Sequence, residues 1–165
     1  MLIEDEGCYQ EALAAANECA PGLSSRIERY TGKRPLFLLY DVATQAEKAL
    51  MRRVWLKSGG YLIIDKTEAL TAIDINSGKF TGKKNSSKEN TIYKVNQEAT
   101  VEIAKQLRLR NISGIIVIDY IDMEEEQDRK NIMNLLDKEL KKDRSKTQIM
   151  GFTKLDLLEM TRKKL

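Results

Sequence analysis

The chain has 165 residues, of which 42% are hydrophobic and 32% charged, a balance that is typical of a folded globular domain and excludes general disorder. Its 28 Lys and Arg against 25 Asp and Glu give a net charge of only +3, so any binding of nucleic acid would depend on local clusters of cations. Histidine is absent, which removes the commonest zinc ligand and general base and leaves a metal ion or a carboxylate to activate water in any hydrolytic reaction.

The first 52 residues show helical periodicity that is interrupted by helix breakers. The periodic stretches predict helices over residues 6–20, 24–30 and 43–51. Pro21-Gly22 ends the first of these helices, and a short apolar stretch precedes the last one. We therefore predict a small helical appendage in this part of the chain.

From residue 53 the hydrophobic pattern changes to the two-residue period of strands. Apolar residues on both sides of Gly59-Gly60 predict a β-hairpin over residues 54–64, and a further strand is predicted over residues 68–76. Residues 78–90 are rich in Gly, Ser, Lys and Asn and lack periodicity, so they are predicted to form a loop. This loop is the most basic stretch of the chain.

The second half of the chain alternates helices and strands. The pattern predicts helices over residues 92–108 and 123–142, and strands over residues 114–120, 148–152 and 157–161. The strand at 114–120 is a nearly continuous apolar run, which predicts burial on both faces under packed helices. We therefore predict an α+β fold, with helices packed on a mixed β-sheet and the small helical appendage before it.

Two aspartates are predicted to lie at the ends of strands. Strand alternation places Asp74 and Asn76 on one face, while Ile73 and Ile75 point to the other. Asp119 follows an apolar run at the end of another strand, where ligand-binding groups of open sheets often lie. If the two strands are neighbours, Asp74 and Asp119 can share one Mg²⁺, which proteins bind through one or two carboxylates. This pattern is typical of a metal-assisted phosphodiesterase.

A simpler interpretation stays open for both aspartates. Strand-end aspartates often cap the next helix or accept hydrogen bonds in a turn. Asp122 is the clearest example, because Asp122-Met123-Glu124-Glu125 has the Asp-x-x-Glu spacing of a capping box. We therefore interpret Asp122 as a helix cap.

The cysteines and the hydropathy pattern indicate an intracellular protein. Cys8 and Cys19 lie eleven positions apart, which matches neither a zinc knuckle nor a disulfide framework, and we interpret them as buried or idle thiols in a reducing compartment. The apolar runs are too short to span a bilayer, and the acidic start Ile3-Glu4-Asp5-Glu6 is not that of a signal peptide. We expect a cytoplasmic protein without bound zinc.

Six motifs follow one another along the chain. They are VWLKSGG at 54–60, TEALTAIDINSG at 67–78, NQEA at 96–99, IAKQLRLR at 103–110, GIIVIDYIDM at 114–123 and LLEMTR at 157–162. In this order they resemble the successive signatures of the ribonuclease E/G family, and the resemblance covers essentially the whole chain. It implies that residues 1–52 are a helical lead-in from the end of a preceding subdomain and that residues 53–165 are a metal-binding catalytic subdomain.

The resemblance also implies an activity and a site. The catalytic part of the family resembles deoxyribonuclease I, and its members are Mg²⁺-dependent endonucleases of RNA processing and decay. They hydrolyse single-stranded RNA and leave a 5′ phosphate and a 3′ hydroxyl. By position in the motifs, Asp74 and Asp119 match the Mg²⁺ ligands, with Mn²⁺ as a substitute, and Asn76 matches the residue that orients them. Water activated by the metal would be the nucleophile.

Several basic residues are candidates for RNA contact, each with a simpler alternative. Arg108 and Arg110 follow a helix end next to the strand of Asp119 and could neutralise phosphates near the metal, or they could only complement the helix dipole. The lysines of the predicted loop could follow an RNA strand or simply be solvated. The candidates among them are Lys79, Lys83 and Lys84.

Other features of the family have no counterpart in this sequence. Full-length members also contain an S1-type RNA-binding domain, a sensor for the 5′ monophosphate and a Cys-Pro-x-Cys motif that shares zinc between two subunits. We therefore expect weak RNA binding, little turnover and no zinc-linked oligomer for this chain. The alternative is a non-catalytic RNA-binding or scaffold module. A protein-interaction domain would need a large exposed apolar patch, which the amphipathic helices do not indicate.

Overall fold

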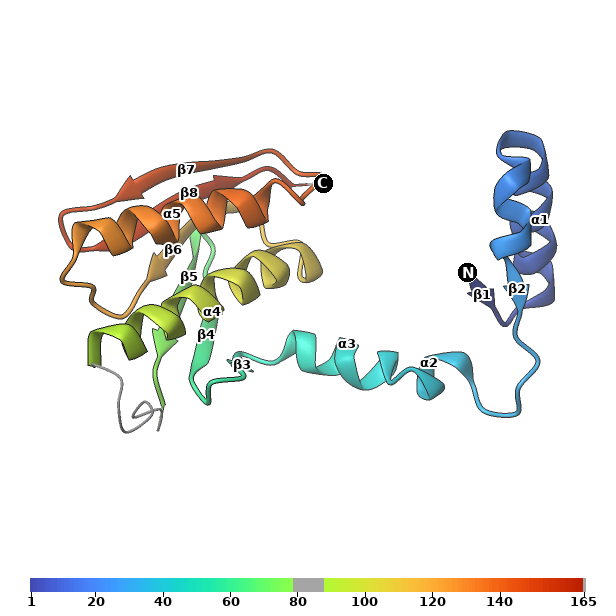
Figure 1. The fold of residues 1–165 in the computed structure, drawn as a ribbon, viewed down its shortest axis with the longest axis horizontal. Helices are drawn as coiled ribbons and strands as arrows, with labels where there is room; N and C mark the ends of the chain where they lie inside the picture. The colour runs from blue at the N-terminus through green and yellow to red at the C-terminus, as the bar shows by residue number, and fades with distance from the viewer. Residues whose placement is uncertain (79–87, 165) are drawn as a thin grey trace. The chain divides into compact units, whose positions relative to one another are not determined.

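A computed structural model describes residues 1–78 and 88–164 (Figure 1). The chain divides into two compact units, Met1–Glu47 and Lys48–Leu165, whereas the sequence pattern places the division between residues 52 and 53. Among the described residues no helix is long and apolar enough to cross a membrane.

The first unit consists mainly of short elements. They are β1 (Leu2–Ile3), α1 (Glu6–Cys19), the 3₁₀ helix η1 (Pro21–Arg26), β2 (Glu28–Arg29), α2 (Leu36–Leu39) and the start of α3 (Val42–Leu50). Asp5 caps α1, because its carboxylate accepts a hydrogen bond of 2.8 Å from the Cys8 N–H. The predicted first and third helices are therefore confirmed.

Two expectations for this unit, on the second helix and on exposed apolar residues, are wrong. The helix predicted over 24–30 is a 3₁₀ helix that ends at Arg26, because the N–H groups of Glu28 and Tyr30 donate to backbone carbonyls near the start of the chain and pair β2 with β1 in parallel. Of the two options left open for the cysteines, buried or idle thiols, burial is excluded, because both are free thiols on the surface. Apolar side chains on α2 and just after it are exposed, although no such patch was expected; they are Phe37, Leu38, Leu39 and Tyr40.

The second unit is built on a mixed six-stranded sheet, which confirms the predicted α+β class. Its strands are β3 (Arg53–Trp55), β4 (Tyr61–Lys66), β5 (Leu70–Asn76), β6 (Gly114–Asp119), β7 (Thr147–Phe152) and β8 (Leu157–Arg162). They lie in the order β3-β4-β5-β6-β8-β7. Only the β5–β6 pair is parallel, and all other neighbours are antiparallel. The predicted hairpin and the two closing strands are among them.

Two helices, α4 (Lys88–Leu109) and α5 (Glu126–Leu140), pack against each other and on one face of the sheet (Figure 1). Alternate residues of each central strand face them; on β6 these are Ile116 and Ile118, both 0% exposed. The other face is open. Burial of β6 on both faces was a wrong prediction, because Ile115 points away from the helices and is 51% exposed.

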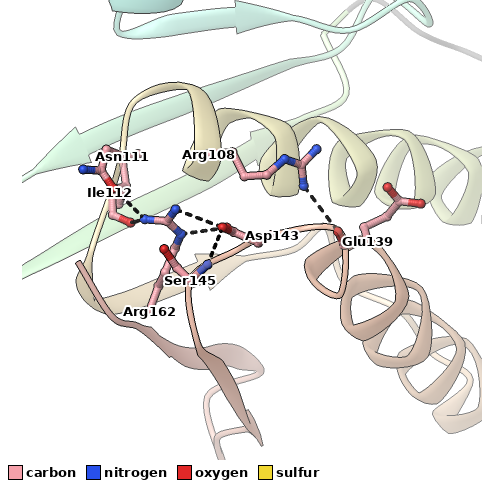
Figure 2. Close-up of polar contacts among 7 residues, drawn as sticks. All are labelled: Arg108, Asn111, Ile112, Glu139, Asp143, Ser145 and Arg162. Atoms are coloured by element: carbon pink, nitrogen blue, oxygen red, sulfur yellow. Dashed lines mark hydrogen bonds and ion pairs between the residues drawn. The ribbon is translucent and has the colours of Figure 1, made fainter. Parts of the chain in front are cut away.

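A buried ion pair joins the last strand to the end of α5. Arg162 donates through Nε and Nη2 to the Asp143 carboxylate at 2.8 and 3.2 Å, and through Nη1 to the backbone carbonyl of Ile112 at 2.8 Å. Asn111 accepts a further hydrogen bond from Nη1 (Figure 2). These contacts occupy all three guanidinium nitrogens, so the charge is buried with its hydrogen bonds satisfied.

Candidate metal centre

The two aspartates singled out from the sequence are direct neighbours in the sheet. β5 and β6 run parallel, and Asp74 is the register partner of Asp119. Adjacent strands lie about 4.8 Å apart, and partners in register point to the same face. Both side chains lie on the open face, at the carboxyl ends of the two strands. The strand adjacency on which the shared-ion hypothesis depends is therefore present.

Asn76 lies on the same face two residues further along β5. Its Nδ2 donates a hydrogen bond of 2.6 Å to Oδ2 of Asp74, so the amide restrains the carboxylate. An open depression of about 390 Å³ surrounds the three side chains and is lined further by residues 75, 77 and 120–122. The geometry expected of an orienting asparagine is present.

Asp119 is electrostatically disfavoured as an anion. Partial burial raises its pKa, and the charges of Asp74 and Asp122 raise it further. Carboxylates gathered in this way repel one another unless a proton or a cation joins them. A divalent ion in the depression would remove this repulsion.

Asp122 belongs to this site and not to a helix cap, so the capping-box interpretation is wrong. Helix α5 begins only at Glu126, its N-cap residue is Glu125, and no side chain caps it. Asp122 is exposed, lines the depression and acts on the pKa of Asp119. A signal was present in the sequence, because Asp119 and Asp122 are separated by only two residues in the Asp-Tyr-Ile-Asp motif.

Helix α4 holds the segment that carries Asp122. Fully buried Asn96 donates to the Ile121 carbonyl at 2.7 Å and accepts from the Ile121 N–H at 3.2 Å. One turn later, the Thr100 hydroxyl lies 3.0 Å from the Tyr120 hydroxyl. Together these bonds keep residues 120–121 against α4 past the end of β6.

The same helix also holds the hairpin turn between β3 and β4. The Glu98 carboxylate accepts hydrogen bonds from the N–H groups of Lys57 and Ser58. Within this turn Gly60 packs so closely that a Cβ would lie 2.8 Å from the backbone oxygen of Asn76. The β3–β4 turn is therefore fixed against the end of β5 that carries the site.

The predicted basic contacts are not brought together with these carboxylates. Arg108 and Arg110 lie at the end of α4, which leads into the start of β6, whereas Asp119 lies at the far end of β6, about 17 Å along the strand. Arg108 donates to the Glu139 carbonyl, and Arg110 donates to the Met51 carbonyl at 2.7 Å. Their expected place near the metal is therefore wrong. Lys79, Lys83 and Lys84 lie outside the described residues.

The donor set fits one hard cation better than a metal cage. Across the described ranges 1–78 and 88–164 there is no cluster of three or more His, Cys, Asp or Glu residues able to enclose an ion. Mg²⁺ does not need one, because it is usually held by one or two carboxylates and keeps its remaining positions for water and phosphate. The Asp74–Asp119 pair on an open face meets this requirement.

Comparisons with known proteins agree with the motif order. A model of the Ribonuclease E/G family matches residues 1–165. The chain is 51% identical over 156 residues to ribonuclease G of Escherichia coli K12, and 48% identical over 162 residues to ribonuclease G of Haemophilus influenzae. It is also 46% identical over 145 residues to ribonuclease E of Escherichia coli K12.

The matches cover most of this chain but a smaller part of the relatives. They include 94, 98 and 88% of this chain, but only 32, 33 and 14% of the three relatives, in the same order. The chain thus spans about a third of the length of the ribonucleases G. The family model and these identities together show that the chain belongs to the ribonuclease E/G family.

Proposed function

We propose that this chain is the catalytic part of an Mg²⁺-dependent endoribonuclease that hydrolyses phosphodiester bonds of single-stranded RNA. The observation that carries the proposal is the register pairing of Asp74 with Asp119 on the open face of the sheet. Family membership supports the same chemistry, because the relatives are named as ribonucleases. Mn²⁺ is the expected substitute for Mg²⁺.

Each polar group of the site has a role in this proposal. Asp74 and Asp119 would hold the cation through their carboxylate oxygens, and Asn76 keeps the Asp74 carboxylate in one orientation through its 2.6 Å hydrogen bond. Asp122 adds negative charge close to Asp119, which favours the approach of a divalent cation. When bound, Mg²⁺ supplies Lewis-acid stabilisation of the phosphate oxygens and a water of lowered pKa.

The reaction is an in-line substitution at phosphorus. The oxygen of water forms a bond to phosphorus as the water gives up one proton, the bond from phosphorus to the 3′ oxygen breaks, and the leaving 3′ oxygen takes up one proton. The open face leaves room for a single strand, and the depression of about 390 Å³ at the strand ends gives the scissile phosphate a place beside the carboxylates.

The test is cleavage of a labelled single-stranded RNA by the 165-residue chain, with Mg²⁺, with Mn²⁺ and with EDTA. We expect slow cleavage with either metal and none with EDTA. Asp74→Asn or Asp119→Asn should lower the rate by about 100-fold or more, as expected for loss of several kcal/mol of transition-state stabilisation. Asp65→Asn is the matched control, because Asp65 lies on the same face but pairs with Arg52.

The result also separates an enzyme from a non-catalytic module. Metal-dependent cleavage that survives in both Asp74→Asn and Asp119→Asn would contradict the assigned site. RNA binding without cleavage by the wild-type chain at any Mg²⁺ or Mn²⁺ concentration would instead favour an RNA-binding or scaffold role.

A further inference from the structure

A cluster of aromatic rings and a cation lies on the same open face as the carboxylates. Trp55 and Tyr61 contact edge to face, with their ring centroids 5.3 Å apart. The Arg53 guanidinium lies 4.6 Å from the Tyr61 ring centroid and 5.6 Å from that of Trp55. Trp55 is 64% exposed, although indole rings are usually largely buried.

Sheet register connects this cluster to the candidate metal centre. Tyr61 is the direct partner of Trp55 on one side and of Asn76 on the other. The three residues form one row across β3, β4 and β5, and Trp55 therefore lies two strand spacings, about 10 Å, from Asn76. Because Asn76 donates to Asp74, the row leads directly from the aromatic rings to the carboxylates.

We propose that Trp55, Tyr61 and Arg53 form a base-stacking site for single-stranded RNA beside the scissile phosphate. An exposed indole face next to a cation is the combination that single-strand binding proteins use, with stacking for the base and positive charge for the phosphate. This inference rests on the proposed nuclease function and adds to it where the neighbouring nucleotide is bound.

The charge of the cluster favours nucleic acid as the occupant over a protein surface. Arg53 forms no ion pair within residues 1–78 and 88–164, whereas the adjacent Arg52 pairs with Asp65. The Arg53 cation therefore remains available to a phosphate while it is held over the rings. The row is also continuous with the candidate metal centre, so an RNA strand bound at the carboxylates would pass close to the rings.

The position of the rings is stabilised by contacts outside the cluster. Glu98 holds the turn after Trp55 through the N–H groups of Lys57 and Ser58. The turn also packs against the backbone of Asn76 at Gly60. A base stacked on Trp55 would thus meet a surface whose distance from the carboxylates is set by the fold.

Trp55 is the single tryptophan of the chain, so its fluorescence reports directly on the site. The experiment titrates the whole chain, in EDTA, with a short single-stranded oligoribonucleotide of mixed sequence. We expect saturable quenching by this RNA and little quenching by an abasic oligomer of the same length, which keeps the phosphates and lacks the bases. A duplex of the same sequence should also quench less, because its bases are already stacked.

Variants separate stacking from general attraction. Trp55→Ala should raise the Kd for labelled RNA, measured by anisotropy, by about fivefold or more, and Trp55→Phe should restore most of the affinity because it keeps an aromatic face. Phe37→Ala is the matched control: that ring is 65% exposed and should leave the Kd unchanged. Unchanged urea midpoints would show that the variants remain folded.

The outcomes distinguish this inference from the proposed function. Quenching in EDTA without any Mg²⁺-dependent cleavage would remove the nuclease proposal and leave the stacking site. The stacking site alone would be overturned by three results together: cleavage depends on Asp74, RNA leaves the Trp55 fluorescence unchanged, and Trp55→Ala binds RNA with the Kd of the wild type. Trp55 emission that changes with protein concentration and not with RNA would overturn it in favour of a protein interface.

Discussion

Asp74 and Asp119 are register partners on neighbouring parallel strands, and the charge of Asp74 helps to raise the pKa of Asp119. A raised carboxyl pKa means that the folded chain binds the proton more tightly than the unfolded chain does. Stability is therefore lost as the pH rises through the interval between the ordinary and the raised pKa. At neutral pH and without metal, this repulsion is present in full.

Asp119→Asn should consequently stabilise the metal-free protein at neutral pH. Because the side chain is exposed, solvent screens the effect, and we expect a rise in Tm of about 1–2 °C that shrinks as the pH falls towards the ordinary carboxyl pKa. Thermal melts across pH measure it. Saturating Mg²⁺ should raise the Tm of the wild type and not that of the variant.

Asp65→Asn is the control with the opposite sign. Its hydrogen bond from Arg52 lowers the pKa of Asp65, so the contribution of Asp65 to stability is present above the ordinary pKa and lost as the pH falls. This variant should lower the Tm slightly at neutral pH. Equal shifts for both variants would contradict the assignment of repulsion to the Asp74–Asp119 pair.

Asn76→Ala should weaken metal binding without removing a ligand. The amide restrains Asp74 through the 2.6 Å hydrogen bond, and loss of such an outer contact usually costs 10- to 100-fold in metal affinity. Titration with Mn²⁺ followed by electron paramagnetic resonance gives the Kd. Ser77→Ala changes the next residue of the depression and should leave the Kd within about twofold. Equal affinities for wild type and Asn76→Ala would remove the orienting role.

Local patterns in the sequence were sufficient to predict part of the site. The alternation Ile73-Asp74-Ile75-Asn76 predicts which side chains share a face, because a strand repeats every two residues. The adjacency of β5 and β6 is a tertiary property, and only the family resemblance pointed to it. Secondary structure was predicted best where periodicity was long, as in α4.

The incorrect predictions share a physical cause. Arg108 precedes the strand of Asp119 in sequence, yet a strand separates its two ends by its full length, so closeness along the chain did not become closeness in space. The capping-box pattern at Asp122 is local, and it was overridden by the two hydrogen bonds between Asn96 and Ile121, which lie 25 positions apart. The aromatic row of Trp55 was missed because it exists only once the strand register is known.

Asn96→Ala should loosen the segment that carries Asp122. Both backbone groups of Ile121 lose their partner in a partly buried place, and each group left unsatisfied away from water costs about 1–3 kcal/mol. We expect the free energy of unfolding, measured with urea, to fall by about 2–4 kcal/mol. Hydrogen exchange at the Ile121 amide should become faster than at Ile118, inside β6.

The control for this variant is Asn134→Ala on the exposed side of α5, which should change stability by less than about 0.5 kcal/mol. Mn²⁺ affinity should also fall in Asn96→Ala, because Asp119 and Asp122 flank the loosened segment. A destabilised variant with unchanged exchange at Ile121 would mean that Asn96 acts elsewhere in the core.

The Arg162–Asp143 pair provides the strongest test of how the sheet is held together (Figure 2). Its two side chains are 0 and 2% exposed. Burial alone would raise the pKa of Asp143, but the hydrogen bonds from Arg162 and from the Ser145 N–H outweigh it, and the pKa is lowered. The contribution of this carboxylate to stability is therefore lost as the pH falls through its folded pKa.

Arg162→Met should cost about 3–5 kcal/mol at neutral pH, because it leaves the Asp143 charge buried without its partner. The double variant Arg162→Met with Asp143→Leu removes both charges and should recover part of that loss. Urea denaturation of the two single variants and the double variant gives the coupling energy. Arg52→Met, at a pair that is 68 and 46% exposed, should cost less than about 1 kcal/mol. Purely additive losses in the double variant would mean that the two side chains contribute through packing and not through their pairing.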